Sequence, residues 1–268
     1  MLRVDQTLLH LHLHAGSVEP APGHWHYGPD VTGSERAHLV VAFNGGFKLR
    51  DSRGGWLSEG RLVAPLRQGA PSVVIYSDGR TDIVTGNGKT VAPPPPTALL
   101  AGASRRVHNT ARIPISVRQN VGVLVANGVP VSTRGLSPRE ITARWGTTYR
   151  GATFVARSGI GITADGHLVW AASDRTTVDA LAAALHTAGA VRAIQLDINA
   201  PLVRGFLFSN ANGSTDPSPI FAQGITPLVV GQTQTPHAPG SNLLGSNQTP
   251  HCDYLTPCPR DFFTLTTL

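Results

Sequence analysis

Charged residues are scarce in this sequence of 268 residues. They make up 14% of the chain, whereas about 25% is usual for a soluble domain. No apolar run approaches the roughly 20 residues of a membrane-spanning helix. Although the chain has 29 Gly and 21 Pro, this content stays below the roughly 25–30% that is typical of disordered chains. We therefore expect no transmembrane segment, and the 41% hydrophobic content is enough for one large folded domain.

Lysine is nearly absent, because Lys48 and Lys89 are the only two among the 22 Lys and Arg residues that give a net charge of +6. Arginine binds phosphate and carboxylate groups through a bidentate fork. The arginines are scattered, with Arg105 and Arg106 as the tightest pair, whereas nucleic-acid binders concentrate them in a stripe. The charge indicates either an anionic ligand or simply an arginine-rich surface, and we expect no nucleic-acid partner.

Only two cysteines are present, Cys252 and Cys258. Without paired CxxC motifs, a zinc site made of cysteines is not expected. The two residues either form a disulfide, which fits an oxidising compartment, or remain free thiols. The start of the chain lacks the apolar core and cleavage signature of a signal peptide. Either a leader is missing from this sequence or the protein stays inside the cell.

Three strand pairs joined by tight turns are the clearest local signals. Asn-Gly and Asp-Gly favour type I′ turns, in which both central residues have positive φ. An antiparallel-rich sheet system follows from three such hairpins. Their turn residues are Asp78-Gly79, Asn127-Gly128 and Asp165-Gly166.

One helix is well marked, and a buried strand follows it. Thr176 is expected to cap the helix with Asp179 three positions later, and Gly189 to end it. The strand 191–196 then leads to Asp197. In such a strand–helix–strand unit, Asp197 would lie at the carboxyl end of a strand, where α/β sheets commonly bind ligands.

Alternating histidines near the N-terminus raise the question of a metal site. On a strand, His10, His12 and His14 would share one face, and His24 and His26 follow closely. A zinc site needs three or four ligands in a tetrahedral arrangement, which this spacing does not supply. We expect an edge strand with an exposed histidine face, no bound metal and no cofactor.

The apolar strand 39–43 runs into Asn44, Gly45 and Gly46. Two glycines allow the backbone to approach a ligand closely and to present its N–H groups. Asn44 adds one donor and one acceptor at the end of the strand. The segment is therefore either a ligand-binding turn or an ordinary hairpin turn.

Four segments together resemble a known family. They occur in the order and spacing of the phosphodiester glycosidase family, which includes the lysosomal enzyme that removes N-acetylglucosamine from a sugar phosphodiester. The resemblance covers roughly residues 39–230, and residues 260–263 are similar to the end of actinobacterial members. The segments are Ala42-Phe-Asn-Gly-Gly-Phe47, Arg118-Gln-Asn120, Arg157-Ser-Gly-Ile-Gly-Ile-Thr-Ala-Asp-Gly166 and Ala193-Ile-Gln-Leu-Asp-Ile-Asn199.

This resemblance implies an α+β fold with antiparallel-rich mixed sheets, several hairpins and a few helices. We expect an N-terminal segment, 1–38, packed on a phosphodiester glycosidase-like domain, 39–268. Irregular loops are expected within that domain at 92–112, 209–219 and 231–259.

The chain departs from the family at one turn. Members commonly carry Leu-Asp-Gly-Gly-Gly-Ser where this chain has Leu196-Asp-Ile-Asn-Ala-Pro201. Pro201 has no N–H, and a β-branched residue such as Ile198 does not easily adopt positive φ. An anion-binding backbone at this turn would be altered or lost, which leaves the fold unaffected but bears on catalysis.

The resemblance implies a role for each candidate residue. Asp197 would be the nucleophile or general base, Arg157 and Arg118 would hold the phosphate, and Asn44 with Gly45 and Gly46 would contact the sugar or an oxyanion. Plain structural roles stay open, since Arg157 could pair with an acid and Asp197 could cap the next loop. The further candidates for substrate binding are Gln119, Asn120 and Asn199, although Gln119 and Asn120 could equally bind loop backbone.

The leading expectation is an extracellular or cell-envelope hydrolase that cleaves sugar-1-phosphodiesters in an anionic envelope glycan or a sugar phosphate. A cytoplasmic location is not excluded. The alternative is a non-catalytic protein of the same fold that binds such a sugar phosphate. The sequence leaves the oligomeric state open.

Overall fold

The structure is a computed structural model that describes residues 1–85, 112–208, 217–221 and 252–268. Its strands form three sheets, and every pairing among the described residues is antiparallel. The expected α+β fold built on antiparallel sheets is thus confirmed. The helices in the described part are α1 (Gly33–His38), α2 (Leu49–Ser52), α4 (Pro138–Trp145) and α5 (Val178–Thr187), with a 3-10 turn η1 (Tyr149–Gly151).

The three sheets are named A, B and C, with strands given in spatial order. Sheet A contains β1 (Leu2–Val4), β12 (Leu168–Thr176), β11 (Val155–Thr163), β13 (Ala190–Ile198), β9 (Val123–Ala126) and β10 (Val129–Pro130). Sheet B contains β15 (Pro217–Phe221), β14 (Gly205–Phe208), β3 (Leu39–Asn44), β16 (Phe262–Thr267) and β2 (Leu9–His14). Sheet C contains β5 (Arg61–Ala64), β4 (Trp56–Ser58), β8 (Pro114–Gln119), β6 (Ser72–Tyr76) and β7 (Thr81–Val84).

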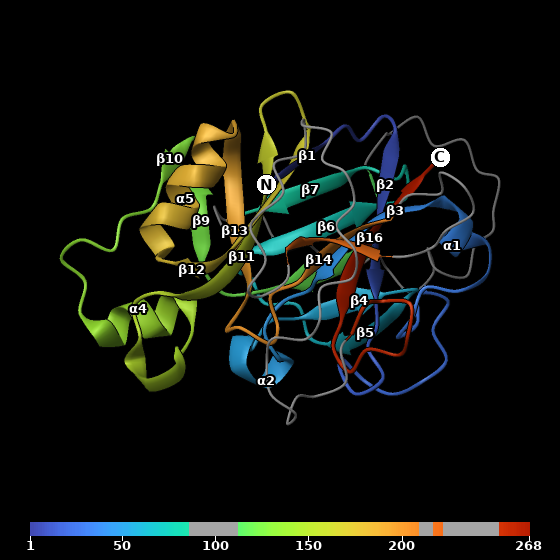
Figure 1. The fold of residues 1–268 in the computed structure, drawn as a ribbon, viewed down its shortest axis with the longest axis horizontal. Helices are drawn as coiled ribbons and strands as arrows, with labels where there is room; N and C mark the ends of the chain where they lie inside the picture. The colour runs from blue at the N-terminus through green and yellow to red at the C-terminus, as the bar shows by residue number, and fades with distance from the viewer. Residues whose placement is uncertain (86–111, 209–216, 222–251) are drawn as a thin grey trace.

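One hydrophobic core is shared by all three sheets. Trp170 of sheet A, Phe43 and Phe263 of sheet B, and Trp56 of sheet C belong to the same buried cluster. The opposite face of sheet A is covered by α5, seen in orange at the left of Figure 1, through a second cluster that includes Leu181 and Leu185. The three sheets therefore pack around one common core.

The last strand of the chain, β16, lies inside sheet B rather than at its edge. It pairs with β3 on one side and with β2 on the other, so Phe262 stands opposite both Asn44 and His14. The first and last strands of this sheet in sequence order are thus neighbours, and the two residues before β16, Arg260 and Asp261, lie beside the end of β3. This insertion decides what surrounds Asn44.

All three predicted hairpins are present, but their turns differ from the prediction. Positive φ at both central residues occurs only at Asn127 (51°) and Gly128 (76°). In the two Asp-Gly turns only the glycine, Gly79 or Gly166, has positive φ. These connections are longer than two residues, and such loops commonly combine a type I turn with a glycine in the left-handed region. The prediction of type I′ turns was wrong for both.

The helix and strand before Asp197 are confirmed, with two corrections. The N-cap is Thr177 rather than Thr176, because Thr177 accepts a hydrogen bond from the Ala180 N–H (3.1 Å) while Thr176 still belongs to β12. Strand β13 extends through Ile198. Both β12 and β13 pair with β11, which lies between them, so Asp197 is in an antiparallel sheet and not at the end of a parallel α/β unit.

The N-terminal segment contributes β1 to sheet A and β2 to the edge of sheet B. An exposed histidine face on β2 was a wrong prediction for His14, which has no exposed surface. Its imidazole Nε2 lies 2.9 Å from Glu35 of α1 and its Nδ1 lies 2.9 Å from the carbonyl oxygen of Gly28. The 28–38 segment therefore covers this end of the strand.

The predicted irregular loops are only partly visible. Residues 92–111, 209–216 and 231–251 lie outside the described residues. Residues 217–219, where a loop was expected, form the first part of β15. Residues 252–259 contain no helix or strand and include a disulfide between Cys252 and Cys258.

The central position of β16 can be tested with Phe263→Ala. The Phe263 side chain is completely buried and contacts Phe43, with ring centroids 5.7 Å apart. Removing a buried phenylalanine ring leaves a cavity, so we expect the free energy of unfolding to fall by about 3–5 kcal/mol. Urea unfolding measures it. The matched control is Leu268→Ala one residue beyond β16, where the side chain is 68% exposed, and equal losses in both variants would contradict the placement.

Candidate functional site

Asn44 ends β3 and connects sheet B to sheet A. Its side-chain NH2 donates to the Ser158 hydroxyl of β11 (2.9 Å) and to the Gly45 carbonyl (2.9 Å). Its side-chain oxygen accepts from the Arg204 N–H (3.2 Å). The Ser158 hydroxyl in turn donates to the Asp197 carbonyl (3.2 Å). Asn44 is thus linked through one hydroxyl to the strand that carries Asp197.

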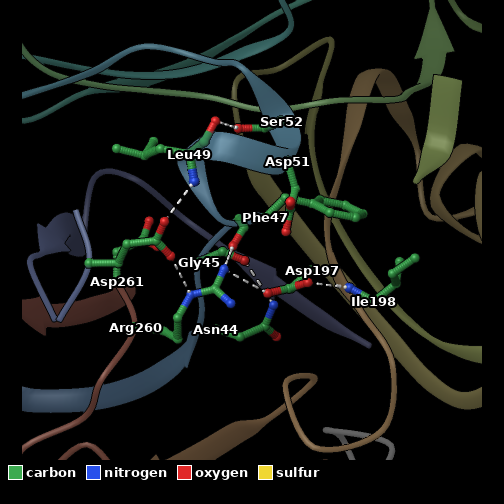
Figure 2. Close-up of polar contacts among 12 residues, drawn as sticks. Asn44, Gly45, Phe47, Leu49, Asp51, Ser52, Asp197, Ile198, Arg260 and Asp261 are labelled. Atoms are coloured by element: carbon green, nitrogen blue, oxygen red, sulfur yellow. Dashed lines mark hydrogen bonds and ion pairs between the residues drawn. The ribbon is translucent and has the colours of Figure 1, made fainter. Parts of the chain in front are cut away.

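Asp197 lies one residue before the end of β13 and is 5% exposed. One carboxylate oxygen accepts from the Ile198 N–H (2.8 Å), and the other accepts from the Arg260 guanidinium (3.1 Å). Figure 2 shows the carboxylate held between these two groups. Burial raises the pKa of Asp197 to about 7, although Arg260 and the Ile198 N–H act in the opposite direction. The carboxyl group can therefore both accept and release a proton near neutral pH.

Arg260 is the link between this carboxylate and the backbone beside Asn44. Its Nη2 donates to the Gly46 carbonyl (2.7 Å) as well as to Asp197, and its Nε lies 3.1 Å from a carboxylate oxygen of Glu19. The other Glu19 oxygen accepts from the Leu49 N–H (2.9 Å). The guanidinium is thereby fixed between two acids.

Arg118 and Asp261 form a second, buried ion pair, and Asp261 directly follows Arg260 of the first pair in the sequence. The Nε of Arg118 donates to Asp261 (2.6 Å), and the two side chains are 1% and 2% exposed. Arg118 also donates to the carbonyls of Gln119 (2.7 Å) and Phe47. These contacts occupy both Nη atoms and the Nε of Arg118, so its guanidinium holds the loop after β3 in place. The structure gives it a structural partner and not an open anion site.

Gly45 and Gly46 are required by packing within this network. A Cβ atom on Gly45 would lie 2.5 Å from the Asp261 carbonyl oxygen, and one on Gly46 would lie 2.9 Å from the Asn120 side chain. Neither glycine is among the residues with positive φ. The Gly45 N–H donates to Asp261 (3.1 Å), and its carbonyl accepts from the Asp197 N–H (3.1 Å). The sequence predicted that these glycines let a ligand approach the backbone closely, but in the structure the groups that approach them are Asp261, Asn120 and Arg118 of the protein itself.

Arg157 differs from the other buried arginines. It is 2% exposed, and its Nη1 donates to the Gln195 side-chain oxygen (2.9 Å). In the described part of the chain it forms no ion pair, and its Nε has no hydrogen-bond partner. Burial lowers the pKa of Arg157 to about 10, so the group remains charged at neutral pH. A buried cation without a counterion is unfavourable, which makes Arg157 the group best suited to receive an anion.

Gln119 and Asn120 serve the protein backbone. The Gln119 side chain binds the N–H groups of Gly55 (3.0 Å) and Arg67 (2.7 Å) and the carbonyl of Arg67 (3.0 Å). Asn120 accepts from the Phe47 N–H (3.2 Å) and donates to the Gln195 carbonyl (2.6 Å). These contacts are the structural alternative considered for the two residues, and they leave Asn120 as a bridge between the loop after β3 and β13.

The turn after Asp197 keeps a left-handed residue without glycine. Ile198 stays in β13 and is fully buried, while Asn199 adopts positive φ (74°), which asparagine tolerates better than most residues. The Ile198 N–H is used by the Asp197 side chain, and the Asn199 N–H donates to the Ala156 carbonyl (2.9 Å). These two amides are therefore committed within the protein.

The structure brings Asn44, Asp197 and Arg118 into one connected network and attaches Arg157 to it through Gln195. Sequence reasoning missed five members. Arg260 and Asp261 were noticed only as similar to the end of the family, although they supply both ion pairs. The others are Ser158 and Gln195, which lie within motif segments but carried no signal of their own, and Glu19, which lies outside all four segments. In the described residues no three His, Cys, Asp or Glu side chains are grouped to hold a metal ion, and no helix there could span a membrane.

The raised pKa of Asp197 predicts how stability depends on pH. The folded state, with a pKa of about 7, binds the proton more tightly than the unfolded chain, whose aspartate pKa is about 4. Stability from the protonated carboxyl is fully present below the unfolded pKa and is lost as the pH rises through 7. Asparagine cannot ionise, so we expect the unfolding free energy of Asp197→Asn, minus that of the wild type, to increase between pH 4 and 7.

Urea unfolding of both proteins between pH 4.5 and 8.5 measures this difference, in which the titration of other groups cancels. The matched control is Asp174→Asn, which makes the same substitution at an exposed position on β12, and the pH-dependent increase for Asp197→Asn should exceed any change seen in this control. A pH-independent difference for Asp197→Asn would show that burial does not raise this pKa.

Comparison with known proteins gives the family. The family model described as phosphodiester glycosidase matches residues 37–197, and a search of curated proteins found no match. Among solved structures, the catalytic domain of zebrafish N-acetylglucosamine-1-phosphodiester alpha-N-acetylglucosaminidase, auto-inhibited by its pro-peptide, is 16% identical, with a TM-score of 0.49 over 98% of this chain and 74% of that one. A hypothetical protein from Synechocystis is 11% identical, with a TM-score of 0.48 over 97% of this chain and 57% of that one. Since the family model matches more than half of the sequence, the chain belongs to the phosphodiester glycosidase family.

Proposed function

We propose that this protein hydrolyses sugar-1-phosphodiesters, with Asp197 and Arg157 as the principal catalytic residues. The observation that carries the proposal is the pairing of a buried carboxyl group whose pKa is about 7 with a buried guanidinium that has no acidic partner among the described residues. Perturbed ionisable groups of this kind are typical of active sites. Membership of the family supports a glycosidase-type reaction.

The leaving group explains why one carboxylate suffices. An ordinary glycoside needs a second carboxyl group to protonate a poor alkoxide leaving group. A phosphate monoester has a second pKa of about 6, so it departs without full protonation when cations stabilise its charge. Arg157 is the cation available for this purpose.

In the proposed reaction, Asp197 acts as the general base. It takes a proton from a water molecule while the water oxygen bonds to the anomeric carbon and the bond from that carbon to the phosphate oxygen breaks. The electron pair leaves with the phosphate monoester, whose charge Arg157 stabilises. The proton on Asp197 is then released to solvent, which its pKa near 7 allows. Asn44 orients this strand end through Ser158, and Arg260 positions the carboxylate.

A binding protein without catalysis is the second candidate. It is favoured by the altered turn after Asp197, where the Ile198 and Asn199 N–H groups are used by Asp197 and Ala156 and Pro201 has none. Such a protein would use Arg157 to hold the phosphate and would release it unchanged.

We further propose that the substrate is an anionic glycan or sugar phosphate of the cell envelope and that the protein acts outside the cytoplasm. The net charge of +6 favours association with polyanions. The disulfide between Cys252 and Cys258 is of the kind that persists in oxidising compartments.

The release of free sugar from an aryl phosphodiester of a sugar 1-phosphate tests the reaction. For the wild type, kcat/KM should rise with pH through about 7, because the general base must be ionised. Asp197→Asn should lose this dependence and about 10²–10⁴-fold in rate. Arg157→Gln should lose about 10²–10³-fold, as expected when one charge-stabilising donor is removed.

The matched controls are Asp82→Asn and Arg192→Gln, which break a half-exposed ion pair (2.8 Å) that involves the start of β13, away from Asp197. Both should keep the rate of the wild type. Full activity of Asp197→Asn would refute its role. Tight binding of the phosphodiester without hydrolysis by the wild type would establish the binding protein instead.

A further inference from the structure

Two exposed aromatic rings lie on one segment that is attached to the candidate site. Tyr149 is 72% exposed and Phe154 is 57% exposed, and they are the only exposed Phe, Tyr or Trp side chains among the described residues. Both belong to the segment 146–154, which connects α4 to β11. In Figure 1 this segment runs from α4 at the lower left to β11. Single exposed apolar residues are common and need no explanation, but two exposed rings on one short segment, each with an arginine beside it, suggest a binding surface.

Each ring is paired with an arginine. The guanidinium carbon of Arg150 lies 5.1 Å from the centre of the Tyr149 ring, and that of Arg175 lies 6.0 Å from the centre of the Phe154 ring. Neither guanidinium forms an ion pair within the part of the chain that the structure describes. Both cations are thus held against a ring while their N–H donors remain available to an anion.

Arg150 also adopts an uncommon backbone conformation. Its φ is 54° and its ψ is 25°, in the left-handed region that residues other than glycine rarely occupy. A residue other than glycine is strained in this conformation, and such residues are often found at ligand sites. The conformation places the Arg150 side chain beside Tyr149.

The segment is directly attached to the candidate site. At its start, the Trp145 carbonyl accepts a hydrogen bond from Gln195 (2.7 Å), the residue that holds Arg157. At its end, Phe154 precedes β11 and lies three residues from Arg157, which is about 10 Å along a strand. A ligand bound at Arg157 and extended along β11 toward the start of that strand would run in the direction of Phe154.

The charge of this region suits an anionic ligand. Between residues 134 and 154 there are four arginines and one acid, so the segment is strongly basic. Arginine binds phosphate through two parallel hydrogen bonds, and aromatic rings pack against the apolar faces of ring-shaped ligands. In a polymer that alternates sugar rings and phosphates, the sugar rings can pack on the aromatic side chains and the phosphates can bind the arginines.

We propose that Tyr149, Arg150, Phe154 and Arg175, the aromatic–arginine rim, bind the sugar-phosphate units of a polymeric substrate beyond the bond that is cleaved. This inference rests on the proposed function, because it treats Arg157 as the phosphate site from which the polymer extends. The rim makes the preferred substrate a polymer rather than a small phosphodiester.

Binding of a linear polymer of hexosamine units joined by 1-phosphodiester bonds tests the rim. Titration calorimetry in the Asp197→Asn background avoids turnover of the polymer. We expect the Tyr149→Ala/Phe154→Ala and Arg150→Gln/Arg175→Gln double variants each to raise Kd at least 10-fold. In proteins with Asp197 intact, the same changes should leave kcat/KM for the aryl phosphodiester within twofold. The control double variant Val129→Ala/Arg80→Gln, at two exposed positions, should change neither the Kd for the polymer nor kcat/KM for the aryl phosphodiester.

Three further probes identify the ligand class. Neutral dextran and inorganic polyphosphate should each bind at least 10-fold more weakly than the sugar-phosphate polymer, since each offers only one of the two chemistries. A single-stranded DNA oligonucleotide that binds as tightly as the polymer and loses affinity in the same variants would overturn the proposal in favour of nucleic acid. An unchanged Kd in the rim variants, or no polymer binding by the parent protein, would also overturn it. Failure of the proposed function is distinguished from failure of the rim proposal, because in that case the wild type does not hydrolyse the aryl phosphodiester at all.

Discussion

The buried ion pair between Arg118 and Asp261 is the contact on which the rest of the site depends. It joins β8 of sheet C to the residue that leads into β16 of sheet B, and both side chains are almost fully excluded from water. Two charges in such a place are tolerated only with good geometry and further hydrogen bonds, and removing one partner commonly costs about 3–5 kcal/mol. Here the further bonds run to the Phe47 and Gln119 carbonyls. The pair therefore fixes the loop after β3 against two sheets.

The positions of the neighbouring residues follow from this pair. With Asp261 fixed, its carbonyl meets the Gly45 N–H, and the space left over is too small for a Cβ atom on either glycine. Arg260, one residue earlier, is then directed toward Asp197 and the Gly46 carbonyl. The insertion of β16 between β3 and β2 thus determines the surroundings of the carboxyl group of Asp197.

Local features of the fold were predictable from the sequence, and long-range contacts were not. The hairpin turns and the amphipathic helix depend on residues close together in the chain, so their existence was predicted correctly. The errors at Thr176 and at the Asp-Gly turns concern single boundary residues, where several turn types compete. Helix α4 had a readable signal, since Ser137 and Glu140 form a complete capping box, and it was overlooked.

In the candidate site, too, residues in local motifs were predictable from the sequence and their long-range partners were not. Asn44, Arg157 and Asp197 could be named because they stand in motifs that resemble a family. Their partners could not, because Arg260 lies 63 residues from Asp197 and Asp261 lies 143 residues from Arg118. No local pattern connects such distant residues, and only the order of strands in sheet B brings them together. For Gln119 the sequence left both ligand binding and backbone binding open, and in the structure the side chain binds backbone.

Asp197 and Arg157 are both buried, yet their surroundings differ in a way that separates their roles. Asp197 has a cation at 3.1 Å and a backbone donor at 2.8 Å, and burial still raises its pKa to about 7. Arg157 has one neutral partner in Gln195, so its charge is uncompensated within the described residues. A protein that only needed to fill space there would be more stable with an apolar side chain. The buried charge is explained if an anion completes the pair, and Arg157 stands opposite Ile198 on the neighbouring strand, one residue from Asp197.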